Sequence, residues 1–144
     1  MNDDFETVLN NLLTNLQGKL SGTIPNISRR AQHWTEVKTQ PALQIRHIGQ
    51  DDEWHNAAFN VTELELDLFL YVPADTDPNL PPDTTLNARM KEVRQAFAWD
   101  DPNTKQFTIG RTVNWCRIAG RTDKDDGATD GQGKAAMTVK ITLP

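Results

Sequence analysis

Three acidic residues share one side of the segment most strongly patterned as a strand. Glu63, Glu65 and Asp67 alternate with leucines between Val61 and Val72. Two carboxylates on one strand face can work as general acid and general base if burial separates their pKa values. The same alternation is typical of a half-exposed strand with one face on the core. The pattern therefore favours a solvated or interface face over a catalytic pair.

An acidic run near the end of the chain has the composition of a calcium loop but not its spacing. A calcium loop needs carboxylates at alternate positions, glycine at the sixth position and glutamate at the twelfth. Counted from Asp123, Gly127 comes one place early and Lys134 occupies the twelfth position. We expect an acidic loop here and no metal site.

Histidine and cysteine do not form a recognisable reactive pattern. His33, His47 and His55 lack ligand-like spacing, and the single cysteine, Cys116, leaves no Cys-x-x-Cys pair for zinc. The sequence also lacks a phosphate-binding glycine loop, a Gly-x-Ser-x-Gly elbow and a dinucleotide fingerprint. We therefore predict a non-enzyme with no catalytic residue and no cofactor, and keep a small hydrolytic enzyme as a distant alternative.

Tryptophans are favoured both in cores and at interface hot spots. Trp115 lies in a predicted strand, and we expect it in the core. Trp34 and Trp54 each lie beside a histidine in predicted loops, and Trp34 follows Arg29 and Arg30. These four loop residues are the candidates for a subunit contact.

Hydrophobic spacing in the first half of the chain predicts one helix and two strands. Apolar residues recur at helical spacing up to Leu20, and Asp3 with Glu6 forms a capping-box pattern at the start. The predicted elements are a helix that has its apolar residues between Phe5 and Leu20 and can end at Gly18 or Gly22, an extended connection with a short turn over 21–41, a strand over 42–48, a loop that includes 51–55, and a strand over 61–72.

The second half predicts a helix followed by short strands. Pro81 and Pro82 set the approach to a helix that begins near Asp83 or Thr84. The remaining predicted elements are a turn over 98–103, strands over 106–110 and 112–119, a mobile loop over 121–133, and a terminal strand over 137–143.

These elements indicate an α+β fold in the order α-β-β-α-β-β, with residues 1–144 as one domain. Two amphipathic helices suffice to cover one face of a mainly antiparallel sheet of four to five strands. The other face then stays partly exposed, which suggests that the protein functions in an assembly whose partners contact this face.

Composition narrows the class of partner. The 144 residues have a formal net charge of −5 and a sequence pI near 5.1. This net negative charge argues against a protein that coats nucleic acid over its whole surface. The charge is unevenly divided: residues 51–101 hold twelve acidic and three basic residues, a net −9, whereas the flanks hold twelve basic and eight acidic residues, a net +4. With one cysteine, no secretory signal and no bilayer-length apolar run, we expect a soluble cytoplasmic product without a membrane partner.

Several short segments resemble, in order, the tail terminator proteins of long-tailed bacteriophages. The resemblance runs from about residue 28 onward. Its segments are Ser28–Val37, Gln40–Leu43, Glu53–Trp54, the strand end Leu70–Val72, the proline-bounded start of the second helix, Cys116–Gly120 and Val139–Pro144.

The resemblance implies a small α/β subunit of a six-membered ring that caps the tail tube, ends its polymerisation and joins the head. Its partners would be further copies of itself, the tail tube protein and a connector or neck protein. The protein would be assembled in the host cytoplasm and would reside in the virion. DNA would cross the central channel without specific binding, and the alternative is a head-side connector ring of the same junction.

The resemblance to a ring subunit implies positions for the three acidic strand residues, the two halves of the charge distribution and the loop over 121–133. The channel, or a neighbour's basic surface, would meet Glu63, Glu65 and Asp67, because an acidic lining does not retain DNA. A ring subunit joins its neighbours through two different, complementary patches. The unevenly divided charge would orient adjacent subunits, and residues 121–133 are the candidate for ordering on docking.

Overall fold

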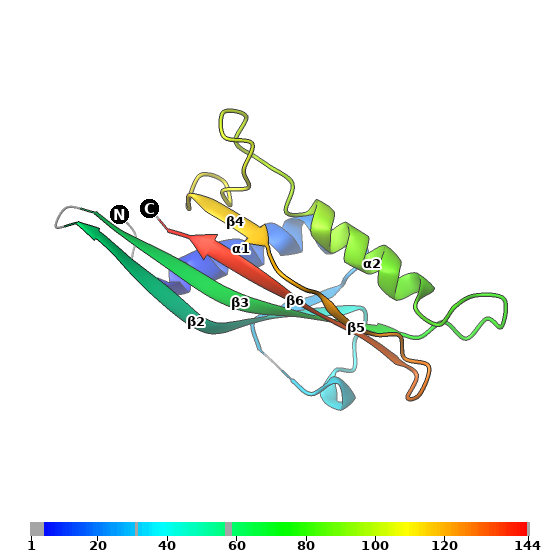
Figure 1. Ribbon diagram of the computed structural model, residues 1–144. Coiled ribbons are helices and arrows are strands. Elements are labelled where there is room, and N and C mark those ends of the chain that lie inside the picture. Colours follow the sequence, from blue (N-terminus) through cyan, green and yellow to red (C-terminus); the bar gives the residue numbers. More distant parts are fainter. Residues whose placement is uncertain (1–4, 31, 57–58, 144) are drawn as a thin grey trace.

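The computed structural model describes the backbone of residues 5–30, 32–56 and 59–143, and the side chains of these ranges apart from 53–60. Two helices, a short 3₁₀ helix and one sheet make up this part of the chain (Figure 1). The elements are α1 (Phe5–Leu20), β1 (Asn26–Ser28), η1 (Trp34–Glu36), β2 (Ala42–Asn56), β3 (Phe59–Pro73), α2 (Thr84–Gln95), β4 (Trp115–Ile118), β5 (Asp123–Asp125) and β6 (Gln132–Thr142).

The sheet has six strands in the order β1-β2-β3-β6-β4, and β5 also pairs with β6. β1 runs parallel to β2, and the other pairs are antiparallel. β4 and β5 pair with different parts of the same edge of β6, since Ile118 lies opposite Val139 and Asp123 opposite Ala136. Together they form one interrupted edge strand, and β2 lies toward the other edge of the curved sheet (Figure 1).

Alternation along β3 creates the two faces of the sheet. Leu64, Leu66, Leu68 and Leu70 are fully buried, whereas the residues between them are half-buried. The buried residues of α1 and α2 join the same apolar cluster as these leucines. The helices α1 and α2 therefore pack on one face of the sheet, as Figure 1 shows. The opposite face, which we call the open face, has neither of them over it, and η1 lies against one end of it through Trp34.

The β2–β3 hairpin is longer than predicted. Its pairing continues through Asp51 and Asp52, so the predicted loop over 51–55 is wrong. β6 accompanies β3 only as far as Glu63, with one further backbone hydrogen bond from the Leu143 N–H to the Thr62 oxygen at 2.9 Å. Beyond that point the hairpin continues as a two-stranded ribbon, which we call the hairpin arm (residues 51–56 and 59–62). Both sides of such a ribbon can face solvent, so its charged residues are compatible with a strand.

The sheet differs from the predicted one in three further places. It is mixed and six-stranded, because β1 pairs parallel to β2, and β1 was not predicted. The predicted strand over 106–110 is wrong: only an isolated bridge joins Asp101 to Gln106, and positive φ angles at Ile109 and Gly110 are incompatible with a strand. The expected loop over 121–133 instead contains β5 and the start of β6.

The strand predicted over 112–119 is shorter, since β4 covers only Trp115–Ile118. Trp115 also corrects a prediction, because its side chain is 39% exposed and does not belong to the core. It lies opposite Thr142 on the open face, whereas its neighbour Cys116 faces the helices and is buried.

Candidate interaction surface

The open face collects the acidic strand residues together with basic residues of neighbouring strands. Glu63 accepts a hydrogen bond from Arg117 at 2.9 Å and lies 3.7 Å from the Lys140 ammonium. Glu65 and Asp67 are half-buried and form no ion pair with any described residue. Of the three carboxylates singled out from sequence, Glu63 is therefore ion-paired within the subunit. Glu65 lies opposite Lys140 and Asp67 opposite Arg46 in the sheet ladders, without an ion pair.

An apolar groove lies at the other end of the open face. Trp34 of η1 lies against β3 and β6, and the groove of about 390 Å³ is lined by Phe69, Tyr71 and Ala136 as well as charged residues of β5. The Lys134 ammonium lies 4.6 Å from the centre of the Trp34 ring, a cation–π distance. Trp34 is thus half-buried against its own sheet and still borders an open groove.

Arg29, predicted at a subunit contact, is engaged within the chain. Its guanidinium donates to both carboxylate oxygens of Glu6 at 2.8 and 2.9 Å and to the Asn10 side chain at 2.9 Å. The hydrogen bond with Glu6 raises the pKa of Arg29. Arg29 therefore fastens the segment after β1 to α1. Arg30 is exposed, and the side chain of Trp54 lies outside the described residues.

Sequence reasoning missed a second surface, at the outer edge of β4. A hollow of about 310 Å³ is bounded by the C-terminal end of α2, the loop after it and β4. Its charged lining residues are Arg94, Lys105 and Arg117, and two tryptophans form part of its wall. We call it the Trp–Arg hollow, lined by Arg94, Phe97, Trp99, Lys105, Trp115 and Arg117.

Each tryptophan of the Trp–Arg hollow carries a cation on its ring. Lys105 Nζ lies 4.3 Å from the centre of the Trp99 ring, and the Arg117 guanidinium lies 4.1 Å from that of Trp115. Trp99 is 52% exposed. A tryptophan two residues from an arginine on an edge strand was the one sequence signal for this site, and it was interpreted as core.

The loop that forms one wall of the hollow is organised by Asp100. One carboxylate oxygen accepts from the Thr108 N–H and hydroxyl, both at 2.7 Å, and the other accepts from the Gly110 N–H at 2.8 Å. Burial raises the pKa of Asp100, but these hydrogen bonds outweigh it, so the pKa is lowered overall. Phe107 fills the space beneath, 1% exposed and edge-on to Phe97.

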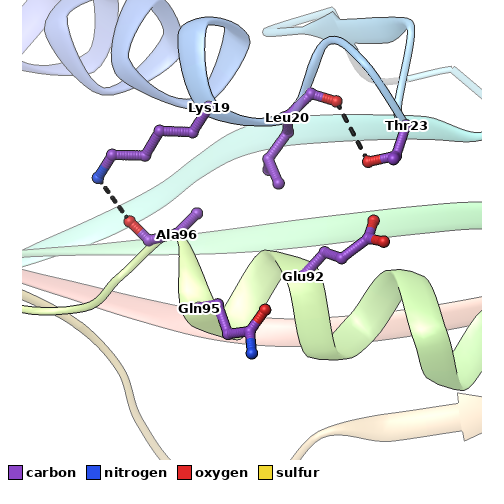
Figure 2. Close-up of a pocket in the computed structure, with 6 residues that line it drawn as sticks. All are labelled: Lys19, Leu20, Thr23, Glu92, Gln95 and Ala96. Atoms are coloured by element: carbon purple, nitrogen blue, oxygen red, sulfur yellow. Dashed lines mark hydrogen bonds between the residues drawn. The ribbon is translucent and has the colours of Figure 1, made fainter.

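A third hollow, of about 410 Å³, lies between the C-terminal ends of the two helices (Figure 2). Lys19 of α1 donates to the Ala96 carbonyl at 2.8 Å, where a positive charge complements the end of α2. Figure 2 also shows Glu92 and Gln95 on α2 at this hollow. Burial lowers the pKa of Lys19. The contact explains how the two helix ends are held together.

Among the side chains that the structure describes, those of residues 5–30, 32–52 and 61–143, no three or more potential metal ligands form a group. Cys116 is buried, and this burial raises the pKa of its thiol. Nor does this part of the chain contain a helix with the length and apolar character needed to cross a bilayer.

No protein-family model and no curated protein matches the chain.

Proposed function

We propose that this protein is a structural subunit that assembles into a ring, of the kind that caps a phage tail tube. The observation that carries the proposal is the open face, where a six-stranded sheet buries leucines beneath two helices and presents Glu65 and Asp67 on its other side. A half-covered sheet with carboxylates that form no ion pair with the described residues is suited to a water-filled channel or to a neighbour's basic surface.

The two edges of the sheet support assembly by a head-to-tail contact. A ring needs two different patches on each subunit, placed so that successive rotations close. The hairpin arm extends from the β2–β3 side of the sheet, and the Trp–Arg hollow lies around the outer edge of β4. One subunit thus carries an acidic projection and a basic hollow on different edges.

An acidic channel face would let DNA pass, because each phosphate bound by lysine or arginine would retard its transit. On this proposal Glu65 and Asp67 line the channel of a ring, which the resemblance implies to be hexameric. The ring would contact the tail tube protein on one side and a connector or neck protein on the other.

Tube-length measurement tests the terminator role. Tail tubes assembled in the presence of the protein should be capped by a ring and have a defined end, and particles lacking it should carry overlong tubes without heads. Tails of normal length detached from heads would instead assign the protein to the head-side connector. A chain that forms no ring on tubes or on connectors would contradict both roles.

A Glu65→Lys/Asp67→Lys variant tests the channel face. In assembled particles the variant should still form rings but retard DNA passage, seen as incomplete genome ejection. The matched control is Glu36→Lys/Asp77→Lys, which makes the same charge change at two exposed residues outside the open-face strands. Unchanged ejection by a ring that contains the Glu65→Lys/Asp67→Lys variant would remove these residues from the channel.

A further inference from the structure

We propose that the hairpin arm of one copy inserts its acidic root into the Trp–Arg hollow of the next copy. This inference rests on the proposed ring and names the contact that would build it. The occupant is therefore a second copy of this chain, and three features of the described residues favour it.

The first feature is charge complementarity. Asp51 and Asp52 are exposed at the root of the hairpin arm, and Glu53 follows them in the sequence. The charged lining of the Trp–Arg hollow is wholly cationic within the described residues. Arg94 and Lys105 form no ion pair there: Arg94 donates to the Thr122 hydroxyl, and Lys105 lies over Trp99. Each surface thus has the charge that the other needs.

The second feature is an unfavourable pair at the root of the hairpin arm. Asp51 lies directly opposite Glu63 across the β2–β3 ladder. Like charges directly opposite each other destabilise a strand pair. Arg117 and Lys140 compensate Glu63, but no described residue forms an ion pair with Asp51. A cation from a neighbouring copy would relieve this repulsion.

The third feature is the distribution of exposed apolar side chains. Among the described residues, four large apolar side chains are prominently exposed: Ile48 at 44%, Leu80 at 43%, Trp99 at 52% and Trp115 at 39%. Ile48 precedes the hairpin arm, and the two tryptophans form walls of the Trp–Arg hollow. Tryptophan and arginine are also the residue types enriched at interface hot spots. Docking would cover apolar surface on both partners.

The geometry allows the contact to repeat. The arm and the hollow lie on different edges of the sheet, so one copy can offer its arm to one neighbour and its hollow to another. In the arm, β2 continues over residues 51–56, and at roughly 3.3 Å per residue this length reaches roughly 15–20 Å along the strand. A two-stranded ribbon of this kind gains stability from a partner.

Reversing the charges separately on the two surfaces tests the contact. Sedimentation velocity would compare the wild type with Asp51→Lys/Asp52→Lys and with Arg94→Glu/Lys105→Glu. We expect each variant to associate at least about tenfold more weakly, because like charges then meet at every contact. An equal mixture should recover the rings. The copies must alternate in such rings, so native mass spectrometry should find both variants in equal numbers.

Matched controls carry the same charge changes at exposed positions elsewhere. Glu36→Lys/Asp77→Lys and Lys38→Glu/Lys91→Glu should assemble like the wild type. Trp99→Ala should weaken assembly without changing the charge. Thermal unfolding of each variant separates loss of the contact from loss of the fold.

Cysteine cross-linking gives an independent readout. Asp52→Cys mixed with Lys105→Cys under oxidation should form a mixed disulfide in excess over either homodimer, since the native Cys116 is buried. Rings that survive both charge reversals, or mixed disulfides at only the statistical share, would overturn the arm-in-hollow contact and leave the ring standing. A wild type that forms no oligomer at any concentration or on tubes would overturn both.

One further outcome would reassign the hollow. Binding of single-stranded DNA by the wild type, lost in Arg94→Glu/Lys105→Glu while the rings stay intact, would identify a nucleic-acid site. Stacking aromatics beside cations can serve that purpose as well. That result would overturn the contact with a second copy.

Discussion

The loop beside β4 and the hairpin arm are both surface segments, yet they are held in different ways. The loop is fixed by the three hydrogen bonds that Asp100 accepts from Thr108 and Gly110 and by buried Phe107 beneath it. The arm is held by its own ladder and by a side-chain hydrogen bond of 2.6 Å from Thr62 to Asp52. The loop is thus fixed by contacts with the rest of the fold, whereas the arm is held mainly by its own pairing.

Removing the aromatic ring beneath the loop should have the largest effect. Phe107 packs edge-on against Phe97, with ring centres 5.6 Å apart, and the Lys19 ammonium lies over the Phe107 ring, 4.3 Å from its centre. Phe107→Ala should lower the free energy of unfolding by about 3–5 kcal/mol, since a buried cavity replaces the ring. Urea denaturation measures the change.

The matched control for Phe107→Ala is Ile48→Ala near the hairpin arm. Ile48 is 44% exposed, so its truncation should change the free energy of unfolding by less than about 0.5 kcal/mol. Equal losses at the two positions would contradict the proposed difference between the loop and the arm.

Asp100→Ala should have the next largest effect. The substitution removes three charge-assisted hydrogen bonds from the loop, and we expect a loss of about 1–3 kcal/mol. Asp101→Ala is the control, because its carboxylate accepts from the neighbouring Asn103 N–H in a local turn. A smaller loss for Asp100 than for Asp101 would show that the loop is organised in another way.

The lowered pKa of Asp100 makes the stability of the fold depend on pH in the acidic range. Because hydrogen bonds lower the folded-state pKa of Asp100 below its ordinary value of 3.8, its stabilising contribution is present above that value. The contribution should disappear as the pH falls through the lowered pKa. Asp100→Asn should therefore lose less stability than the wild type on acidification below pH 3.8, measured by thermal unfolding. A parallel decline of both proteins would contradict the assignment.

Much of the fold could be predicted from sequence, because strong periodicity comes from burial. The leucines of β3 alternate with polar residues, and the predicted helix with apolar residues from Phe5 to Leu20 corresponds to α1. The charged run at Asp51 and Asp52 was interpreted as a loop, since a two-stranded ribbon buries no face and leaves no alternation to detect. β1 was missed because three residues are too few to show a period.

The candidate site was only partly predictable, for a related reason. The strand pattern placed Glu65 and Asp67 on the face away from the leucines, where the structure has them. The Trp–Arg hollow joins residues from α2, the following loop and β4, and such a combination depends on tertiary packing. Arg29 was expected at an interface, but its partner Glu6 lies 23 residues away, beyond the reach of local patterns.

A glycine in the loop should give a smaller effect than the Asp100 carboxylate. Gly110 has φ of +65°, with nothing within 4 Å of an added Cβ, so the cost of Gly110→Ala is conformational and about 1 kcal/mol. Gly18→Ala in α1 is the control of opposite sign: its position is also open, and alanine should stabilise the helix by about 0.5–1 kcal/mol. Chemical denaturation measures the change in the free energy of unfolding for both variants. Changes of the same sign would contradict this prediction.

The smallest expected effect is on the hairpin arm and is local. Thr62→Val removes the hydroxyl that donates to Asp52, and because both residues are at the surface, the free energy of unfolding should fall by only about 0.5 kcal/mol. Hydrogen exchange should nevertheless accelerate at amides of the arm and stay unchanged at β3 amides beside Leu66 and Leu68, because the arm can open without the core. Thr62→Ser keeps the hydroxyl and should exchange like the wild type. Faster exchange throughout β3 would mean that the arm and the core unfold as one unit, which would end the distinction between an adaptable arm and a preorganised loop.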